Sequence, residues 1–198
     1  MEIAFISVEY RLIQNSGKHP EAVRDCLHNI YWIKDHALDF HIDPERFAVM
    51  GSSAGAYLAM IVGLTCSDTL YQPDYGPYQG KTTTVSSVIS NAAMYDWKAI
   101  ERGEAYIGKF RDDLKASAVY LAPLTTTKAF LLLGGEDDAD WSPAASARMM
   151  NRRLNAAGAH SELYLREKTD HTGLYKMEQG YVRWAFKKID PFLEKYLR

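Results

Sequence analysis

The residues Gly51-Ser52-Ser53-Ala54-Gly55 form the pattern G-x-S-x-G, which can present a reactive serine hydroxyl. They directly follow the short apolar run 47–50 and directly precede an apolar stretch rich in alanine and leucine. A strand, a tight turn and a helix in this order form a nucleophile elbow, with the serine at the turn and the free N–H groups of the helix facing the reacting oxygen. We therefore interpret Ser53 as a nucleophile, and expect a Cβ atom at Gly51 or Gly55 to collide with neighbouring chain. The alternative is that Ser52 or Ser53 only caps the helix.

A serine nucleophile requires a general base, and the base requires a carboxylate that orients it. Among the six histidines, His160 begins a predicted strand, and four others precede the serine: His19, His28, His36 and His41. His171 lies in a polar loop after the predicted strand 161–166 and before the last predicted helix. This order along the chain favours His171 as the base. The alternative is a solvated loop histidine.

The orienting carboxylate should follow the preceding strand, which the apolar run 129–133 predicts. The chain there continues as Gly134-Gly-Glu-Asp-Asp-Ala-Asp140. Asp137, Asp138 and Asp140 compete for this role, with Glu136 less well placed. At least two of the three aspartates must be ordinary solvated loop residues.

Strands and helices alternate along the chain, which predicts one α/β domain over residues 1–198 with a parallel, doubly wound sheet. Because ligands bind at the carboxyl ends of parallel strands, the serine, acid and histidine should meet at one sheet edge. The predicted strands are 3–10, 46–50, 85–92, 128–133 and 160–166. The predicted helices are 20–37, 53–64, 142–157 and 179–197, with short helices within 96–121.

Composition excludes several other classes of protein. The 198 residues are 47% hydrophobic and 24% charged, with a net charge of −2, so no basic field recruits nucleic acid or an anionic membrane. No apolar run approaches the roughly 20 residues of a membrane span. Cys26 and Cys66 form no disulfide framework, and with no secretory signal evident we expect a cytoplasmic protein. No metal-ligand, dinucleotide or P-loop motif is present, so we expect neither metal nor cofactor.

Two long stretches carry a resemblance to a known family. The first contains Glu9-Tyr-Arg-Leu12, His19-Pro-Glu-Ala-Val-Arg-Asp25, Trp32-Ile-Lys and the run from Phe40 to Gly55; the second runs from Leu131 to Pro143. They resemble the α/β-hydrolase superfamily, most of all its carboxylesterase and acetyl esterase branch, which includes hormone-sensitive-lipase-like and acetyl-xylan or feruloyl esterases. Counting three residues on from Gly135, the resemblance selects Asp138 as the acid. His171 matches the catalytic histidine of that family.

The resemblance implies a serine hydrolase that acts on carboxylic esters through a Ser53-His171-Asp138 triad and an acyl-enzyme, without a cofactor. The Ala54 N–H is then one oxyanion donor. Because residues 91–121 follow a predicted strand, we expect them on the active-site side as a short lid-like insert, and its shortness favours small acyl esters. The possible pocket residues are Met94, Tyr95, Trp97, Tyr106 and Phe110 from this insert, with Trp141 from the acid loop. Two alternatives stay open: a prolyl-oligopeptidase-like serine peptidase domain, and an inactive, truncated hydrolase.

The sequence also departs from the family pattern. Ala56 and Tyr57 stand where relatives often have glycine and histidine or asparagine, and the family's H-G-G-G oxyanion loop is missing. Because 3–10 matches the fourth strand of the family, we expect a sheet that lacks the first three strands. The segment 3–10 then pairs directly with 47–50, or a second copy fills the gap to give a homo-oligomer, or the segment is displaced. We favour the first two outcomes, because an exposed apolar edge invites pairing.

Overall fold

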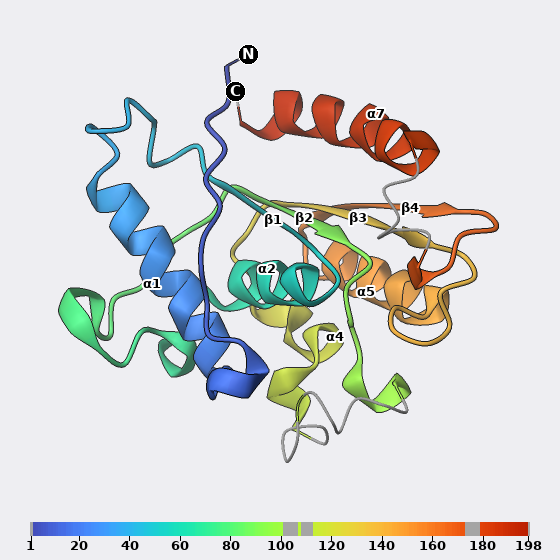
Figure 1. Ribbon diagram of the computed structural model, residues 1–198, viewed down its shortest axis with the longest axis horizontal. Helices are drawn as coiled ribbons and strands as arrows, with labels where there is room; N and C mark the ends of the chain where they lie inside the picture. The colour runs from blue at the N-terminus through green and yellow to red at the C-terminus, as the bar shows by residue number, and fades with distance from the viewer. Residues whose placement is uncertain (1, 101–106, 108–112, 173–178, 198) are drawn as a thin grey trace.

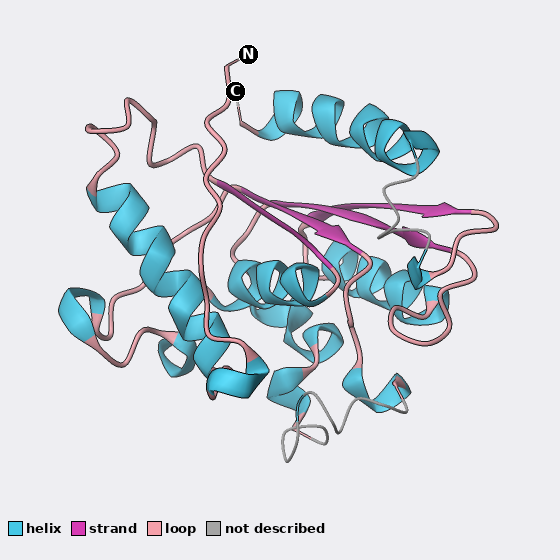
Figure 2. Cartoon of the chain, in the orientation of Figure 1, coloured by secondary structure: helices cyan, strands magenta, loops and turns pink. Residues whose placement is uncertain are grey.

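The computed structural model describes residues 2–100, 107, 113–172 and 179–197. Four parallel strands form one sheet in the order β1-β2-β3-β4 (Figures 1 and 2). The sheet and its helices confirm the predicted α/β class. The strands are β1 Ala48–Ser52, β2 Ser87–Asn91, β3 Ala129–Gly135 and β4 His160–Arg166.

Helices cover both faces of the sheet. Figure 1 shows α2 and α5 on one face and α7 on the other. The helices are α1 Glu21–Asp35, α2 Ala54–Thr65, α4 Ala118–Leu121, α5 Ala144–Ala156 and α7 Gln179–Tyr196. Single 3-10 turns lie at Ile13–Asn15, Thr69–Tyr71, Gly76–Tyr78, Trp97–Ala99, Leu114–Ala116 and Ala122–Leu124.

The inner strand β3 contributes side chains to two hydrophobic cores, one on each face of the sheet. Phe130 and Leu132 pack into the larger cluster with α1, α2, α4 and α5. Leu131 and Leu133, which point to the other face because side chains alternate along a strand, pack against α7. All seven residues of β3 are buried, as the continuous apolar run predicts for a strand covered on both faces.

The N-terminal segment departs from the prediction. Residues 2–10 form no strand, and β1 ends the described sheet on this side. The side chains of Ile3 and Phe5 are 49% and 84% exposed, so the expectation of a buried strand over 3–10 is wrong. Direct pairing with β1 is also wrong: a cavity of about 610 Å³ is lined by this segment and by β1.

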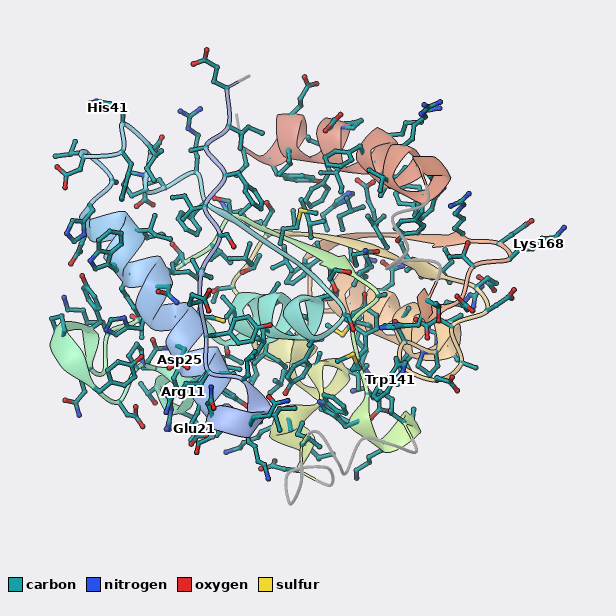
Figure 3. The ribbon with its side chains drawn as sticks, in the orientation of Figure 1. Arg11, Glu21, Asp25, His41, Trp141 and Lys168 are labelled. Carbon is teal, nitrogen blue, oxygen red and sulfur yellow. The ribbon has the colours of Figure 1, made fainter. Side chains whose placement is uncertain are left out.

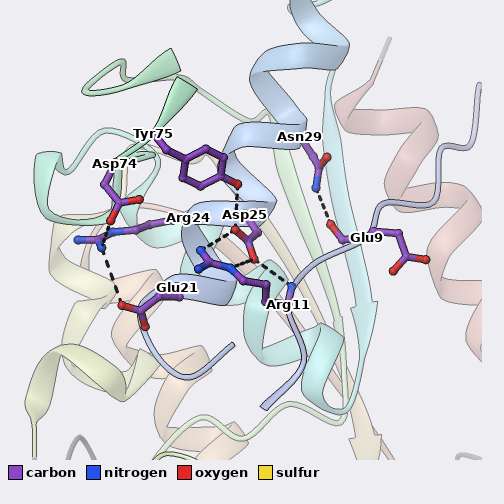
Figure 4. A network of polar contacts seen from close by, with 8 residues as sticks. All are labelled: Glu9, Arg11, Glu21, Arg24, Asp25, Asn29, Asp74 and Tyr75. Atoms are coloured by element: carbon purple, nitrogen blue, oxygen red, sulfur yellow. Dashed lines mark hydrogen bonds and ion pairs between the residues drawn. The ribbon is translucent and has the colours of Figure 1, made fainter. Parts of the chain in front are cut away.

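Polar contacts explain where the N-terminal segment lies (Figure 4). Arg11 donates to Asp25 in α1 from its backbone N–H, Nε and Nη2, at 2.8–2.9 Å. Asn29, one turn further along α1, donates to the carbonyl oxygen of Glu9 at 2.6 Å, and Tyr75 donates to Asp25 at 3.0 Å. Although burial opposes it, the hydrogen bonds from Arg11 hold the pKa of Asp25 below its ordinary value. The segment is therefore held by α1 and not by the sheet.

Candidate active site

Ser53 occupies the turn between β1 and α2 in a strained conformation. Its φ is 52° and its ψ is −116°, a region that residues other than glycine rarely adopt. Its N–H donates to the carbonyl oxygen of Asn91 at 2.9 Å, at the end of β2. The Ser53 side chain makes no capping hydrogen bond to α2, so this serine is not a simple helix cap.

The two glycines of the motif differ in their surroundings. A Cβ atom on Gly51 would lie 2.2 Å from the carbonyl carbon of Gly55, so the predicted collision at Gly51 is confirmed. A Cβ atom on Gly55 would meet nothing within 4 Å, so the same prediction for Gly55 is wrong. The reason is that the Gly51 Cβ would point into the backbone of the turn, whereas the Gly55 Cβ would point into open space.

Three side chains from three strand ends form a continuous chain of hydrogen bonds. The Oγ atom of Ser53 lies 2.9 Å from Nε2 of His171, and Nδ1 of His171 lies 2.5 Å from Oδ2 of Asp138. The His171 side chain is 13% exposed, and the Asp138 side chain is fully buried. Ser53, Asp138 and His171 follow β1, β3 and β4, so one edge of the parallel sheet brings them together.

The surroundings of Asp138 distinguish it from the neighbouring acids. Its Oδ1 atom accepts the backbone N–H groups of Trp141 at 3.2 Å and Ser142 at 3.1 Å, which leaves Oδ2 to His171. The other acids of the loop face away: Asp137 and Asp140 are exposed, and Glu136 pairs with Arg148. Asp138 is therefore the carboxylate of this loop that is hydrogen-bonded to His171.

Backbone contacts join the loop of Asp138 to the loop of His171. The N–H of Glu136 donates to the carbonyl oxygen of Arg166 at 2.9 Å, and the N–H of Asp137 donates to that of Thr169 at 3.0 Å. In Figure 3, Trp141 marks the first loop and Lys168 the second. The two loops thus position the acid and the histidine as one unit.

The proposed pocket residues lie at different depths. Tyr95 and Trp97 are buried in the larger core, 1% and 3% exposed, as is Met94. Trp141 is half-buried, with its ring centroid 6.3 Å from that of His171. Tyr106 and Phe110, and with them most of the middle of the insert 91–121, lie outside the described residues. The pocket role of these residues stays a prediction.

Asn91 and Tyr181 also contact the elbow region, and no motif in the sequence indicated them. The carbonyl oxygen of Asn91 accepts a hydrogen bond from the N–H of Ser53. The Asn91 side chain forms hydrogen bonds with Ser52 and Tyr181. The available signal was a polar residue at the carboxyl end of an apolar strand, where ligand-binding edges of parallel sheets lie.

Within the described ranges, no three histidine, cysteine or acidic side chains gather as a metal site would require. No helix of that part of the chain combines the length and apolar character needed to cross a membrane.

The parallel sheet, the elbow and the hydrogen-bonded serine, histidine and aspartate define an α/β-hydrolase fold. The chain belongs to the BD-FAE family, whose model matches residues 1–138. Among solved structures, carboxyl esterase 2 from Tuber melanosporum aligns with a TM-score of 0.73 at 14% identity, over 96% of this chain and 66% of that one. An acetyl ester-xyloside bifunctional hydrolase from Caldicellulosiruptor lactoaceticus aligns with a TM-score of 0.72 at 22% identity, over 91% and 70%. At these identities the two structures support the fold.

Curated relatives are esterases. Esterase LipC from Mycobacterium tuberculosis is 30% identical over 114 residues, which are 58% of this chain and 27% of that protein. An arylesterase from Saccharolobus solfataricus is 40% identical over 67 residues, 34% of this chain and 22% of that protein. The aligned part of this chain spans 27% of LipC and 37% of esterase LipQ, also from M. tuberculosis.

Proposed function

We propose that this chain is a serine hydrolase that cleaves carboxylic esters of small acyl groups. The observation that carries the proposal is the continuous hydrogen-bond chain from Ser53 through His171 to the buried Asp138. A nucleophile, a base within hydrogen-bond reach and a third group that orients the base are the parts that covalent acyl transfer requires. The esterase relatives support the same class of substrate.

In the proposed mechanism, Ser53 Oγ attacks the ester carbonyl carbon as its proton passes to Nε2 of His171. Asp138 holds the imidazole with Nδ1–H toward its carboxylate and stabilises the imidazolium that forms. His171 then gives the proton to the departing alcohol, which leaves an acyl group on Ser53. Water attacks this acyl-enzyme with His171 again as base, releasing the carboxylic acid and regenerating the serine.

The Ala54 N–H supplies one oxyanion donor in this proposal. Ala54 is the first residue of α2, and the first N–H groups of a helix have no acceptor within it. The sequence contains no H-G-G-G motif to supply a second donor. Since losing one such donor costs a serine hydrolase about 10²–10³ in kcat, we expect residues 1–198 to turn over slowly.

Turnover of p-nitrophenyl esters tests the proposal. We expect hydrolysis of the acetate to exceed that of the octanoate, and the Ser53→Ala variant to lose both activities. Ser86, which bonds to Phe47 and Glu45 at the opposite end of the sheet, provides the control variant Ser86→Ala. Cleavage of a proline p-nitroanilide without ester turnover would instead identify a peptidase. A folded chain inert toward all three substrates would favour the inactive hydrolase.

We also propose that copies of this chain associate through the exposed sheet edge at β1 and the N-terminal segment beside it. Ile3, Phe5, Ile6 and Val8 are each at least 36% exposed, and β1 beside them has no strand partner on its outer side within the described chain. Monomers rarely expose a contiguous apolar patch of this kind. Light scattering should show a mass above 22.4 kDa that falls toward this value in Phe5→Lys. A monodisperse wild-type monomer would contradict the association.

A further inference from the structure

Asn91 contacts two consecutive residues of the elbow. Its carbonyl oxygen accepts the N–H of Ser53 at 2.9 Å, and its Nδ2 donates to Oγ of Ser52 at 3.1 Å. As the last residue of β2, it is paired in register with Ser52, the last residue of β1. The last residue of β2 is therefore hydrogen-bonded to the turn that follows β1.

Tyr181 fixes which way the Asn91 amide faces. Its phenol donates to Oδ1 of Asn91, which leaves Nδ2 directed at Ser52. Tyr181 is 3% exposed, packs its ring against Trp184 and lies with the Arg166 guanidinium 5.8 Å from its ring centroid. An ordinary tyrosine already keeps its proton near neutral pH, and burial raises the pKa of Tyr181 further, so the phenol acts as the donor.

The position of Tyr181 connects the elbow to the histidine. Tyr181 lies in the first turn of α7, the helix that follows the loop carrying His171, so it ties the start of that helix to the elbow. We propose that Asn91 and Tyr181 are positioning residues for the hydrolysis proposed above: they hold Ser52 and Ser53 in the strained turn with Oγ aimed at His171. Strained backbone persists where surrounding contacts over-determine it, and these contacts come from two other elements.

The Tyr181→Phe variant removes one oxygen atom and tests the proposal. Its matched control is Tyr164→Phe, which removes a phenol on the same face of the sheet that donates a hydrogen bond to Glu162. We expect Tyr181→Phe to lower kcat for p-nitrophenyl acetate by about 10- to 100-fold at constant KM, since a small misplacement of reacting groups has effects of this size. Asn91→Ala should lower kcat similarly, and the double variant should lose no more than the single ones.

Amide hydrogen exchange at Ser53 gives a readout that does not depend on turnover. In Tyr181→Phe the Ser53 N–H should exchange at least 10-fold faster than in wild type, and in Tyr164→Phe at the wild-type rate. Equal exchange and equal kcat in the two variants would overturn the positioning role. A wild-type chain without turnover would overturn the proposed hydrolysis, while the exchange comparison would still decide whether Tyr181 and Asn91 hold the elbow.

Discussion

A Cβ atom on Gly135 would lie 2.0 Å from the carbonyl oxygen of Thr169. Gly135 ends β3 three residues before Asp138, and Thr169 lies two residues before His171. The backbones of the two loops therefore touch at a point that only glycine permits. We infer that this backbone contact sets the distance between the segments that carry Asp138 and His171.

Substituting Gly135→Ala should separate the two loops. Overpacking of this kind costs about 1–3 kcal/mol, and we expect both a lower melting temperature and a large loss of ester turnover. Gly134→Ala is the control, because its Cβ would meet only the end of the Leu165 side chain, at 3.2 Å. A Gly135→Ala protein with the stability and turnover of Gly134→Ala would show that the contact is not needed.

The two glycines of the elbow should respond differently to alanine. Gly51→Ala drives a Cβ into the backbone of Gly55, so the turn must open and Ser53 must move away from His171. Gly55→Ala places a methyl group in open space within a helix, where alanine is favoured over glycine by about 1 kcal/mol. Thermal unfolding and turnover measured on both variants check this contrast. Equal losses would mean that the crowding at Gly51 is not the constraint.

The choice among the acidic residues is open to direct measurement. Asp138→Asn keeps the shape of the side chain but loses the carboxylate that orients His171, and by analogy with other triads kcat should fall about 10⁴-fold. Asp137→Asn, at an exposed neighbour in the same loop, should leave kcat within a factor of two or three, roughly what a surface change allows. If the Asp137 variant suffers the larger loss, Asp138 is not the functional acid.

Because His19 is buried, we expect the free energy of unfolding to depend on pH. His19 is 8% exposed and shares a hydrogen bond of 3.0 Å with the Tyr57 hydroxyl; burial lowers its pKa to about 4. The unfolded chain, with a histidine pKa near 6.5, binds the proton between about pH 4 and pH 6.5 while the folded protein does not. The free energy of unfolding should therefore fall as pH drops through this window, by up to about 3 kcal/mol.

Urea unfolding at pH 7 and pH 4.5 measures this slope. His19→Gln should be less stable at pH 7 but should lose less stability on acidification than wild type. His41→Asn, at an exposed position with a positive φ that asparagine tolerates, should retain the wild-type slope. An unchanged slope in His19→Gln would assign the acid sensitivity to other groups.

Much of this architecture could be predicted from the sequence, for physical reasons. The continuous apolar runs of β3 and α2 reflect burial on all sides, and the periodicity of α1 reflects burial on one face; both are recorded in the sequence residue by residue. The elbow could be located because its strand, turn and helix are contiguous. The order of serine, acid and histidine then placed the three residues at one sheet edge, since parallel strands all end there.

The predictions failed where the outcome depends on contacts between distant segments. Residues 3–10 have the composition of a buried strand, but their position is set by hydrogen bonds to α1, from Arg11 to Asp25 and from Asn29 to the carbonyl oxygen of Glu9. Whether a Cβ atom at Gly55 would collide depends on the direction in which it points, and the sequence motif does not specify that direction. The link between Asn91 and Tyr181 spans 90 positions of the chain and carries no local signature.

The central claim is that Ser53 is a nucleophile activated by His171 and Asp138. Intact-mass spectrometry after incubation with a fluorophosphonate tests it most directly, because the reagent phosphonylates a serine that a neighbouring base has activated. We predict a single adduct on Ser53 in the wild-type protein, none in Ser53→Ala, and labelling slowed by at least about 100-fold in His171→Ala. A folded wild-type protein that takes up no label, or that is labelled equally fast after Ser53→Ala, would contradict the account.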